Sequence, residues 1–468
     1  MKTKDLVQKV GDNHYVLPKS GTMNVDAQAF FSEQLFTSSE ESMWDQLVTA
    51  ASYPGVIAAY LMPDAHFGFG VPVGSVVVTD DTFIQSCNGY DISCGILHMK
   101  VPGLKASAVR GFHKREQWVH EVEKRVACGI GRNRPQLMPK FTDTQGEEIL
   151  RYGAQALKVD TNLCERAFIP VDEGIDFRKI DKAWERLIPQ LGSVGAGNHF
   201  IEMQVDPVDG QVWVMVHCGS RGYGHQTADW FFHEAARLRG IKKEHRESSY
   251  LKKDEDLGRM YWNYMASAAN MAVANRHIIV EGINEALEEI FGVRGETYYE
   301  ISHNLVQEET LVLPDGSTKK GFVHRKGATR AFPAGHPDLK GTQWQDTGHP
   351  CLIPGSMFEG AAVLFPKEGA YRSGCSVNHG SGRTIGRKEA KRRFEHKQLR
   401  IDEEMRTVKR TFDGVDIEGI VSNCKHIPLD ECGLVYKDLD GVLNVLQNEG
   451  IATVAHRLYP VANMKGSD

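Results

Sequence analysis

With 468 residues, of which 41% are hydrophobic and 25% charged, the chain has the composition of a globular protein with a sizeable core. Lysine and arginine number 55 against 61 aspartates and glutamates, so the net charge of −6 excludes a protein-wide positive field, and any nucleic-acid surface must be local. No run approaches the roughly 18 apolar residues of a membrane-spanning helix, and nine scattered cysteines exclude a dense disulfide scaffold.

The odd cysteine count and the N-terminal sequence predict the cellular location. Unpaired, scattered cysteines favour a reducing compartment. The first residues, MKTKDLVQKVGDNHY, carry charges throughout and lack the apolar core of a signal peptide. We therefore expect a cytoplasmic protein that has no membrane partner.

The sequence pattern up to Gly95 predicts strands that are followed by glycine-rich loops. The first fifty residues indicate short strands and a helix near Asp26–Phe36. Gly55–Met62 and Val71–Thr79 predict buried strands, followed by the loops Pro63–Gly70 and Cys87–Gly95. Loops of this kind often carry functional groups.

The remaining elements alternate between helices and strands. Charged residues with helical periodicity predict a helical insertion at about 105–190, within a single domain of residues 1–468. A long helix is expected at Asp254–Phe291, and strands at Thr297–His303 and Gly321–His324. A helix from Gly386 to about Phe412 carries a basic first half, which is more often a solvated face than a nucleic-acid surface.

A predicted hairpin carries two histidines. Two β-rich runs flank the five-residue turn Asp206–Gly210. If Val205 pairs with Gln211, His199 faces His217 with Cβ atoms roughly 5 Å apart. The simpler alternative is a core hairpin, since a slip of one residue would place the two imidazoles on opposite faces.

Other candidate metal ligands occur in separate loops. Asp91 and Cys94 offer a carboxylate and a thiolate, and His303 ends a predicted strand. Together with the two hairpin histidines they suit one or two transition metals, with a thiolate able to bridge ions roughly 4 Å apart. Thiolate and imidazole favour zinc, whereas carboxylate and open positions for phosphate favour manganese, so the residue types leave both open.

Glycine-rich segments predict phosphate binding. Backbone N–H groups could cradle an anion at Gly192–Asn198, Gly219–Gly224, Pro354–Met357 and His379–Arg383, although no G-x-x-x-x-G-K-[ST] motif is present. The basic loop His324–Arg330 is predicted to anchor polyanions.

One of these segments also holds a candidate nucleophile. His379 can attack phosphorus to form a phosphoramidate, and Arg383 would stabilise the charged phosphate. A loop histidine bonded to backbone is the simpler alternative.

Nine ordered motifs resemble those of one family. MPDAHFGFGVPVG, GYDISCG, GNHFIE, HCGSRGYGHQ, SHN, HRKGATRAFPAGHP, LIPGSM, NHGSGR and the near-terminal MKG together resemble the RtcB family of RNA ligases, over nearly the whole chain. The resemblance implies a mixed α/β fold with central mixed sheets, flanking helices and a helical insertion. It also implies GTP and two Mn²⁺ ions as cofactors, RNA as the substrate and an archease-type activator as a further partner.

The implied reaction joins RNA 3′-phosphate or 2′,3′-cyclic phosphate ends to 5′-hydroxyl ends. It would pass through a guanylylated histidine and a GMP-activated RNA 3′-end, and it would serve RNA repair or tRNA splicing.

The same resemblance assigns residues to three groups. His379 would be the guanylylated nucleophile, with Arg383 and Asp64 as further catalytic residues. Two Mn²⁺ ions would be held by Asp91, Cys94, His199, His217 and His303, with Cys94 bridging. The guanylate would contact Asn198, His199, Phe200, Glu202, His303, Asn304, Pro354, Gly355, Ser356, Met357, Gly380, Ser381, Gly382 and Lys465.

Some positions depart from the family pattern. Ala361 stands at about the place of a frequent serine, and Asn378 and Ser381 replace the Cys and Ala of the commoner Cys-His-Gly-Ala-Gly. Asn88-Gly89-Tyr90 also replaces a more usual glycine-valine lead-in. None removes a proposed metal ligand or the nucleophile, so nucleotide or substrate preference could differ. Two alternatives stay open: a dinuclear metal-dependent phosphoesterase and a non-catalytic RNA-binding paralogue.

Overall fold

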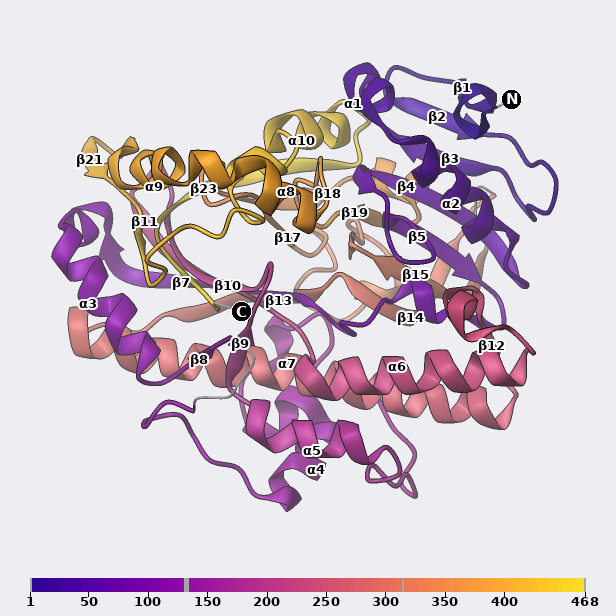
Figure 1. The fold of residues 1–468 in the computed structure, drawn as a ribbon, viewed down its shortest axis with the longest axis horizontal. Helices are drawn as coiled ribbons and strands as arrows, with labels where there is room; N and C mark the ends of the chain where they lie inside the picture. Colours follow the sequence, from indigo (N-terminus) through magenta and orange to yellow (C-terminus); the bar gives the residue numbers. More distant parts are fainter. Residues whose placement is uncertain (1, 130–133, 314, 467–468) are drawn as a thin grey trace.

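Two large mixed sheets form the centre of the protein (Figure 1). The computed structural model describes residues 2–129, 134–313 and 315–466. In the first sheet, β3 and β4 are parallel and the other neighbours antiparallel. Its strands, in spatial order, are β1 Gln8–Lys9, β2 His14–Leu17, β3 Ala27–Phe30, β4 Val56–His66, β5 Val73–Thr79, β15 Thr318–Lys326 and β14 Asn304–Val312.

The second sheet brings distant parts of the chain together. Its order is β13 Glu296–Ser302, β7 Gly95–Lys105, β11 Gln211–Cys218, β10 Phe200–Val205, β23 Ala452–Lys465, β18 Ala361–Pro366 and β17 Cys351–Pro354, with β22 Val421–Ser422 parallel to β23. Short strands complete the fold: β6 Thr82–Phe83, β8 Ala127–Cys128, β9 Ser193–Gly195, β12 Leu251–Lys252, β16 Ala328–Arg330, β19 Ser376–Asn378, β20 Lys409–Phe412 and β21 Val415–Glu418.

Helices cover both sheets, and the longest confirms the helix expected at 254–291. The α-helices are α1 Glu33–Ser38, α2 Glu41–Ser52, α3 Phe112–Glu123, α4 Asp143–Tyr152, α5 Asp181–Gln190, α6 Arg221–Leu238, α7 Asp256–Phe291, α8 Arg387–Phe394, α9 Gln398–Thr407 and α10 Leu439–Asn448. Figure 1 shows α6 and α7 side by side beneath the sheets, with α4 and α5 on their outer side. The mixed α/β fold with flanking helices is therefore confirmed.

Helix α7 buries polar as well as apolar side chains. Tyr261 and Met265 are buried, and so are the polar side chains of Asn270, Asn275 and Arg276. These polar groups donate hydrogen bonds to the backbone carbonyls of Leu150 in α4, Ser193 in β9 and Ser93 in the loop before β7. The helix therefore positions neighbouring segments as well as filling the core.

Two helix predictions are wrong in part. The segment Asp26–Phe36 begins as β3, in which Ala27 and Ala29 are buried, and α1 starts only after Ser32, whose hydroxyl accepts from Leu35 N at 3.2 Å. The basic helix breaks into α8 and α9, and residues 409–412 form β20 because they pair with β21.

The predicted hairpin exists, but its register is wrong by one residue. Val205 pairs with Val212, so Phe200, and not His199, faces His217. The reason is that Asp206 N donates to Gln211 O at 3.0 Å, which shortens the turn to four residues. His199 lies just before the strand.

Residues 105–190 contain α3, α4 and α5, and residues 130–133 of this range lie outside the described residues. The boundary of an insertion stays a prediction. In the described ranges, no helix is both long and apolar enough to span a bilayer. All nine cysteines fall within those ranges, and each is a free thiol.

Candidate active site

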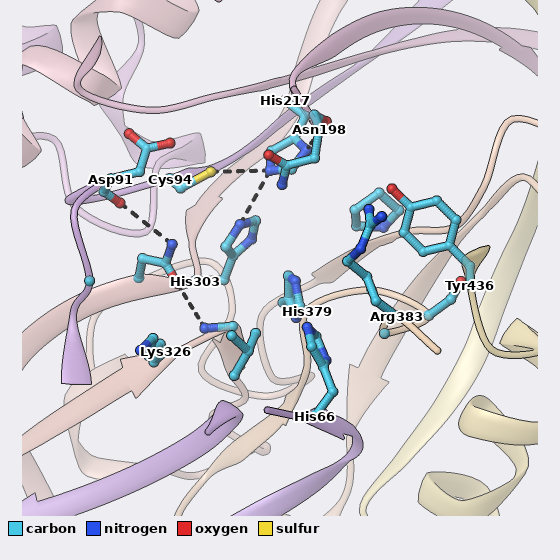
Figure 2. A pocket seen from close by; sticks show the side chains of 18 of the residues that line it. His66, Asp91, Cys94, Asn198, His217, His303, Lys326, His379, Arg383 and Tyr436 are labelled. Carbon is cyan, nitrogen blue, oxygen red and sulfur yellow. Dashed lines mark hydrogen bonds between the residues drawn. The ribbon is translucent and has the colours of Figure 1, made fainter. Parts of the chain in front are cut away.

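A cavity of about 580 Å³ opens where loops from both sheets meet (Figure 2). Its volume lies in the range of small-molecule sites. Figure 2 shows Cys94, His217 and His303 on one side of His379, and Arg383 and Tyr436 on the other. The candidate metal ligands Cys94, His217 and His303 and the candidate nucleophile His379 thus line the same cavity.

Cys94 and two histidines form a compact cluster at the cavity wall. The Cys94 Sγ atom lies 3.4 Å from His199 Nε2 and 3.2 Å from His217 Nε2. Asp91 Oδ2 is 2.8 Å from His199 Nε2, and His303 Nε2 is 3.3 Å from His217 Nε2. Potential ligand atoms of Cys94, His199 and His217 all lie within 4.8 Å of one another. The structure therefore brings all five predicted metal ligands together.

Backbone carbonyls orient two of these imidazoles. His199 Nδ1 is 2.9 Å from Val194 O, and His217 Nδ1 is 3.1 Å from Asn198 O. With Nδ1 as donor, each Nε2 directs a lone pair at the neighbouring ligand atoms. A cation between these donors would relieve their repulsion, so the residues fit a transition metal such as Mn²⁺ or Zn²⁺.

The electrostatics keep the imidazoles of His217 and His303 neutral. Burial, followed by the charge of neighbouring histidines, lowers the pKa values of His217 and His303 well below the ordinary 6.5. Burial and then Asp91 raise the pKa of the Cys94 thiol well above 9.0. Neutral imidazole is the form that binds metal, whereas the thiol requires a cation nearby to ionise.

An unusual backbone conformation closes the Asp91–Cys94 loop. Ser93 has a φ of 57°, a value that few non-glycine residues adopt. Its hydroxyl is 2.7 Å from that of Ser302, and its carbonyl accepts from Arg276 Nη1 at 2.8 Å. These contacts hold the strained residue in place.

The candidate nucleophile rests against a buried carboxylate. His379 Nδ1 lies 2.7 Å from Oδ2 of Asp64, which is fully buried. The two side chains come close because Gly382, with a φ of 77°, packs on Asp64, where a Cβ would lie 2.2 Å from the Asp64 carbonyl oxygen. The backbone N–H of His379 also donates to Oδ2 of Asp64 at 3.3 Å, so the carboxylate fixes the position of His379.

Cationic side chains line the other end of the cavity. Arg383 packs over the Tyr436 ring at 5.4 Å and donates to Asp430 O at 2.8 Å. Arg387, the first residue of α8, donates to Asn198 Oδ1 at 3.2 Å. This end offers guanidinium groups for phosphate.

The predicted guanylate residues separate into two sets. Those that line the cavity are Asn198, Phe200, His303, Asn304, Pro354, Gly355, Gly380, Ser381 and Gly382. The others, which are buried and are not among the lining residues, are His199, Glu202, Ser356, Met357 and Lys465. Lys465 Nζ instead donates to Gly197 O at 3.2 Å and lies 5.8 Å from the centroid of the Phe200 ring. Ala361 is buried in β18 opposite Pro354.

The basic loop at 324–330 is not a polyanion anchor. Arg325 is buried in β15 and pairs with Glu309, and Arg330 is buried in β16 and pairs with Glu165 at 3.1 Å. Lys326 lines the cavity, but its ammonium donates to backbone carbonyls.

The predicted phosphate loop at 219–224 also has another role. Its first residues lead into α6, which begins at Arg221, and this segment does not line the cavity.

Sequence reasoning assigned no role to several lining residues. They are His66, Phe69, Val73, Asn88, Gly89, Tyr90, Arg387 and Tyr436. Most lie in or beside the recognised motifs, so proximity to the assigned residues was the available signal. Tyr436 lies in no motif, and only the tertiary contact with Arg383 places it there.

Known proteins resemble this chain over most of its length. The sequence profile described as tRNA-splicing ligase RtcB matches residues 46–466. The chain belongs to the RtcB family. It is 33% identical to the tRNA-splicing ligase RtcB of Thermococcus kodakarensis, over 98% of this chain and 99% of the relative. It is 30% identical to the tRNA-splicing ligase RtcB of Methanococcus maripaludis, over 99% of this chain and 100% of the relative. It is 32% identical to the RNA-splicing ligase RtcB of Mycobacterium bovis, over 90% of this chain and 100% of the relative.

The RtcB match contains every residue of the candidate site, from Asp64 to Lys465. The relatives are aligned over nearly their full lengths, so the likeness extends to the whole protein and not only to the cavity motifs. The named relatives are RNA- or tRNA-splicing ligases.

Proposed function

We propose that this RtcB-family chain is a GTP- and Mn²⁺-dependent RNA ligase that joins 3′-phosphate or 2′,3′-cyclic phosphate ends to 5′-hydroxyl ends. The observation that carries the proposal is a shared cavity, in which His379, held by Asp64, opens beside the Cys94, His199 and His217 cluster. A metal-dependent phosphoesterase would need the cluster, but it gives His379 and Asp64 no necessary role.

Asp91, Cys94, His199, His217 and His303 would hold the Mn²⁺ ions. Bound Mn²⁺ supplies positive charge that neutralises phosphate oxygens. The chain prepares for this by keeping His217 and His303 neutral and by fixing the Nδ1 sides of His199 and His217 on carbonyls.

In the proposed first step, His379 Nε2 attacks the α-phosphorus of GTP. A P–N bond forms, the bond to the bridging oxygen breaks, and pyrophosphate leaves. Asp64 holds the Nδ1 proton and stabilises the positive charge that develops on the ring. Arg383 and Arg387 lie where they can neutralise phosphate oxygens.

Two further transfers complete the proposed reaction. An oxygen of the RNA 3′-phosphate attacks the GMP phosphorus, and the P–N bond breaks, which restores His379. The RNA 5′-hydroxyl then loses its proton to solvent and its oxygen attacks the 3′-phosphorus. The bond between that phosphorus and the bridging GMP oxygen breaks, and GMP leaves. A 2′,3′-cyclic phosphate must first be opened by water to a 3′-phosphate.

The test is transfer of label from α-³²P-GTP to the protein with Mn²⁺, followed by denaturing electrophoresis. We expect an acid-labile label on the wild type and on His233→Ala, a surface control on α6. The label should be absent from His379→Ala, whose Mn²⁺ content should match the wild type. Ligation retained by His379→Ala would refute the mechanism.

The same assay separates the alternatives. Release of phosphate from a simple ester without GTP would support a phosphoesterase, and RNA binding without either activity would support a non-catalytic paralogue. An archease-type activator is part of the proposal, and its contribution would be measured as the increase in labelling when purified archease is added.

A further inference from the structure

An aromatic group at the cavity edge has no role in the proposed nucleotide chemistry. Phe69 and Tyr90 both line the cavity, with ring centroids 5.5 Å apart. Tyr90 stacks on His225 at 4.9 Å, and the Phe232 ring packs against both Phe69 and Tyr90, at 5.5 and 5.1 Å. The rings therefore form one supported aromatic surface that opens into the cavity.

Phe69 stays 36% exposed although its loop is firmly held. Gln46 bonds both the N–H and the carbonyl of Gly68, at 3.0 and 2.6 Å. Lys326 Nζ donates to the carbonyls of Phe69 and Val71, at 2.5 and 3.1 Å. A large apolar ring that is fixed at a cavity rim, rather than folded into the core, indicates a surface built for a ligand.

A cation accompanies the two rings. Arg246 Nη2 donates to the Tyr90 hydroxyl at 3.0 Å, and its guanidinium lies 5.7 Å from the Phe69 centroid. Lys242 and Lys243, on the same connecting segment, are exposed. Aromatic faces interleaved with cations are the chemistry that binds single-stranded nucleic acid, because every base has a π face and every linkage a negative charge.

The position suits an RNA end rather than the guanylate. Tyr90 directly precedes the candidate metal ligand Asp91. Figure 2 shows Asp91 and Lys326, which anchors Phe69, across the cavity from Arg383 and Tyr436. A nucleotide whose base stacks on Phe69 would thus place its terminal phosphate or hydroxyl towards the candidate metal ligands.

We propose that Phe69 and Tyr90 form a stacking platform for the terminal nucleobase of an RNA end, with Arg246 as its cation. This inference rests on the proposed RNA ligase function and adds a substrate-binding site to it. The platform recognises a base of any sequence, because stacking reads no hydrogen-bond edge.

The test uses 2-aminopurine, whose fluorescence is quenched by stacking. One RNA carries it next to a 3′-phosphate and a second next to a 5′-hydroxyl, each with its other end blocked, in Mn²⁺ without GTP. We expect the wild type to quench one of the two probes, and the quenched probe identifies the end that the platform holds. Phe69→Ala should weaken binding of that RNA by about 5- to 100-fold.

Matched variants separate stacking from packing. Phe67→Ala removes a ring that is 53% exposed on the same loop but does not line the cavity, and it should bind like the wild type. Compared with Phe69→Ala, Phe69→Tyr should restore the quenching of the probe. Phe69→Leu should restore the melting temperature of the protein but not the quenching. A purely structural Phe69 would predict that leucine rescues RNA binding as well.

Three results would overturn the platform. They are equal RNA affinity of Phe69→Ala and the wild type, wild-type binding without quenching of either probe, and a Phe69→Ala defect confined to GTP affinity. Failure of the proposed function looks different, since the wild type itself would then neither bind nor join these RNAs.

Discussion

At the scale of single residues, the proposed mechanism assigns to the Asp64–His379 contact the choice of the imidazole nitrogen that reacts. Asp64→Asn keeps the size of the side chain but removes the charge that holds the Nδ1 proton. We expect the rate of guanylylation to fall by about 10²-fold or more. Single-turnover labelling with α-³²P-GTP measures this rate. The matched control is Asp45→Asn, the same change at an exposed carboxylate on α2, which should label at the wild-type rate. An undiminished rate in Asp64→Asn would remove Asp64 from the mechanism.

Glu202 gives a pH-dependent prediction. Burial raises its pKa to about 7, although Gln204 and Asn463 donate to it at 2.7 and 2.8 Å. The folded state therefore binds a proton that the unfolded state releases, so the stability contributed by Glu202 decreases as pH rises from about 4 towards 8. At roughly 1.4 kcal/mol per pKa unit, the decrease is on the order of 3 kcal/mol.

Urea unfolding of the wild type and Glu202→Gln at pH 4.5 and pH 8 measures this effect. Glutamine cannot ionise, so the variant should gain stability relative to the wild type as pH rises. A stability difference that is the same at both pH values would show that Glu202 titrates normally.

Residue chemistry explains which site residues could be predicted from sequence. Asp91, Cys94 and His303 were identifiable as candidate ligands because few residue types bind transition metals and because each stands at or near the end of a predicted strand. Burial of Glu202 and Lys465 was not identifiable, because it depends on which side of β10 and β23 faces the cavity. That orientation is set by packing between segments that are distant in sequence, as the hydrogen bond from Asn463 to Glu202 shows.

At the scale of elements, α7 supports the backbone next to the candidate metal ligands Cys94 and His217 through the buried side chain of Arg276. Arg276 donates to the carbonyls of Ser93 and Cys218, both at 2.8 Å, and pairs with buried Glu300. Arg276→Met leaves Glu300 unpaired, so we expect a loss of about 3–5 kcal/mol of unfolding free energy. Chemical denaturation measures this loss.

The double variant Arg276→Met/Glu300→Gln separates charge from positioning. It should recover much of the stability, because no buried charge is left unpaired. Mn²⁺ affinity should stay reduced, since the Ser93 and Cys218 carbonyls still lack their donor. Full recovery of Mn²⁺ binding would show that Arg276 does not position the loops.

Helix α8 presents a basic face beside the cavity. Arg387, Lys388, Lys391, Arg392 and Arg393 are all exposed, and the first and third lie within 3.6 Å of the carboxylates of Glu431 and Asp430, respectively. If RNA crosses this face, changing Lys388, Arg392 and Arg393 to glutamate should weaken RNA binding. The slope of the logarithm of the binding constant against the logarithm of the salt concentration should become less steep by about 2. Fluorescence anisotropy at several salt concentrations measures both.

A matched triple variant controls for net charge. Lys140, Lys182 and Lys340 are exposed elsewhere, and changing them to glutamate alters the total charge equally. Equal loss of RNA affinity in both triple variants would indicate a general charge effect and no α8 surface.

Element boundaries show where sequence patterns were sufficient. Helix α7 was predictable because its apolar spacing persists over 36 residues. The hairpin register was not, because a single backbone bond between Asp206 and Gln211 decides the turn length. The long basic helix was overestimated, because residues 409–412 gain more from pairing with β21 than from local helical propensity.

At the scale of the whole molecule, the site exists only in the folded chain. The lining residues run from His66 to Tyr436, and the cluster joins Cys94 on the loop before β7 to His199 and His217 on the hairpin. An unfolded chain scatters these ligands, so a metal should bind the native state far more tightly than the unfolded state. Binding of the proposed metal would therefore be linked to global stability.

Linkage gives a prediction for metal removal. At 100 times its dissociation constant, Mn²⁺ should stabilise the wild type by about 2.7 kcal/mol, seen as a melting temperature that rises with Mn²⁺ and falls with a chelator. Cys94→Ala should lose this dependence, while Cys351→Ala, which removes a buried thiol from β17, should keep it despite a lower starting temperature. Because each variant is compared with itself with and without metal, cavity effects of the mutations cancel. An unchanged Mn²⁺ shift in Cys94→Ala would mean that the ion binds outside this cluster.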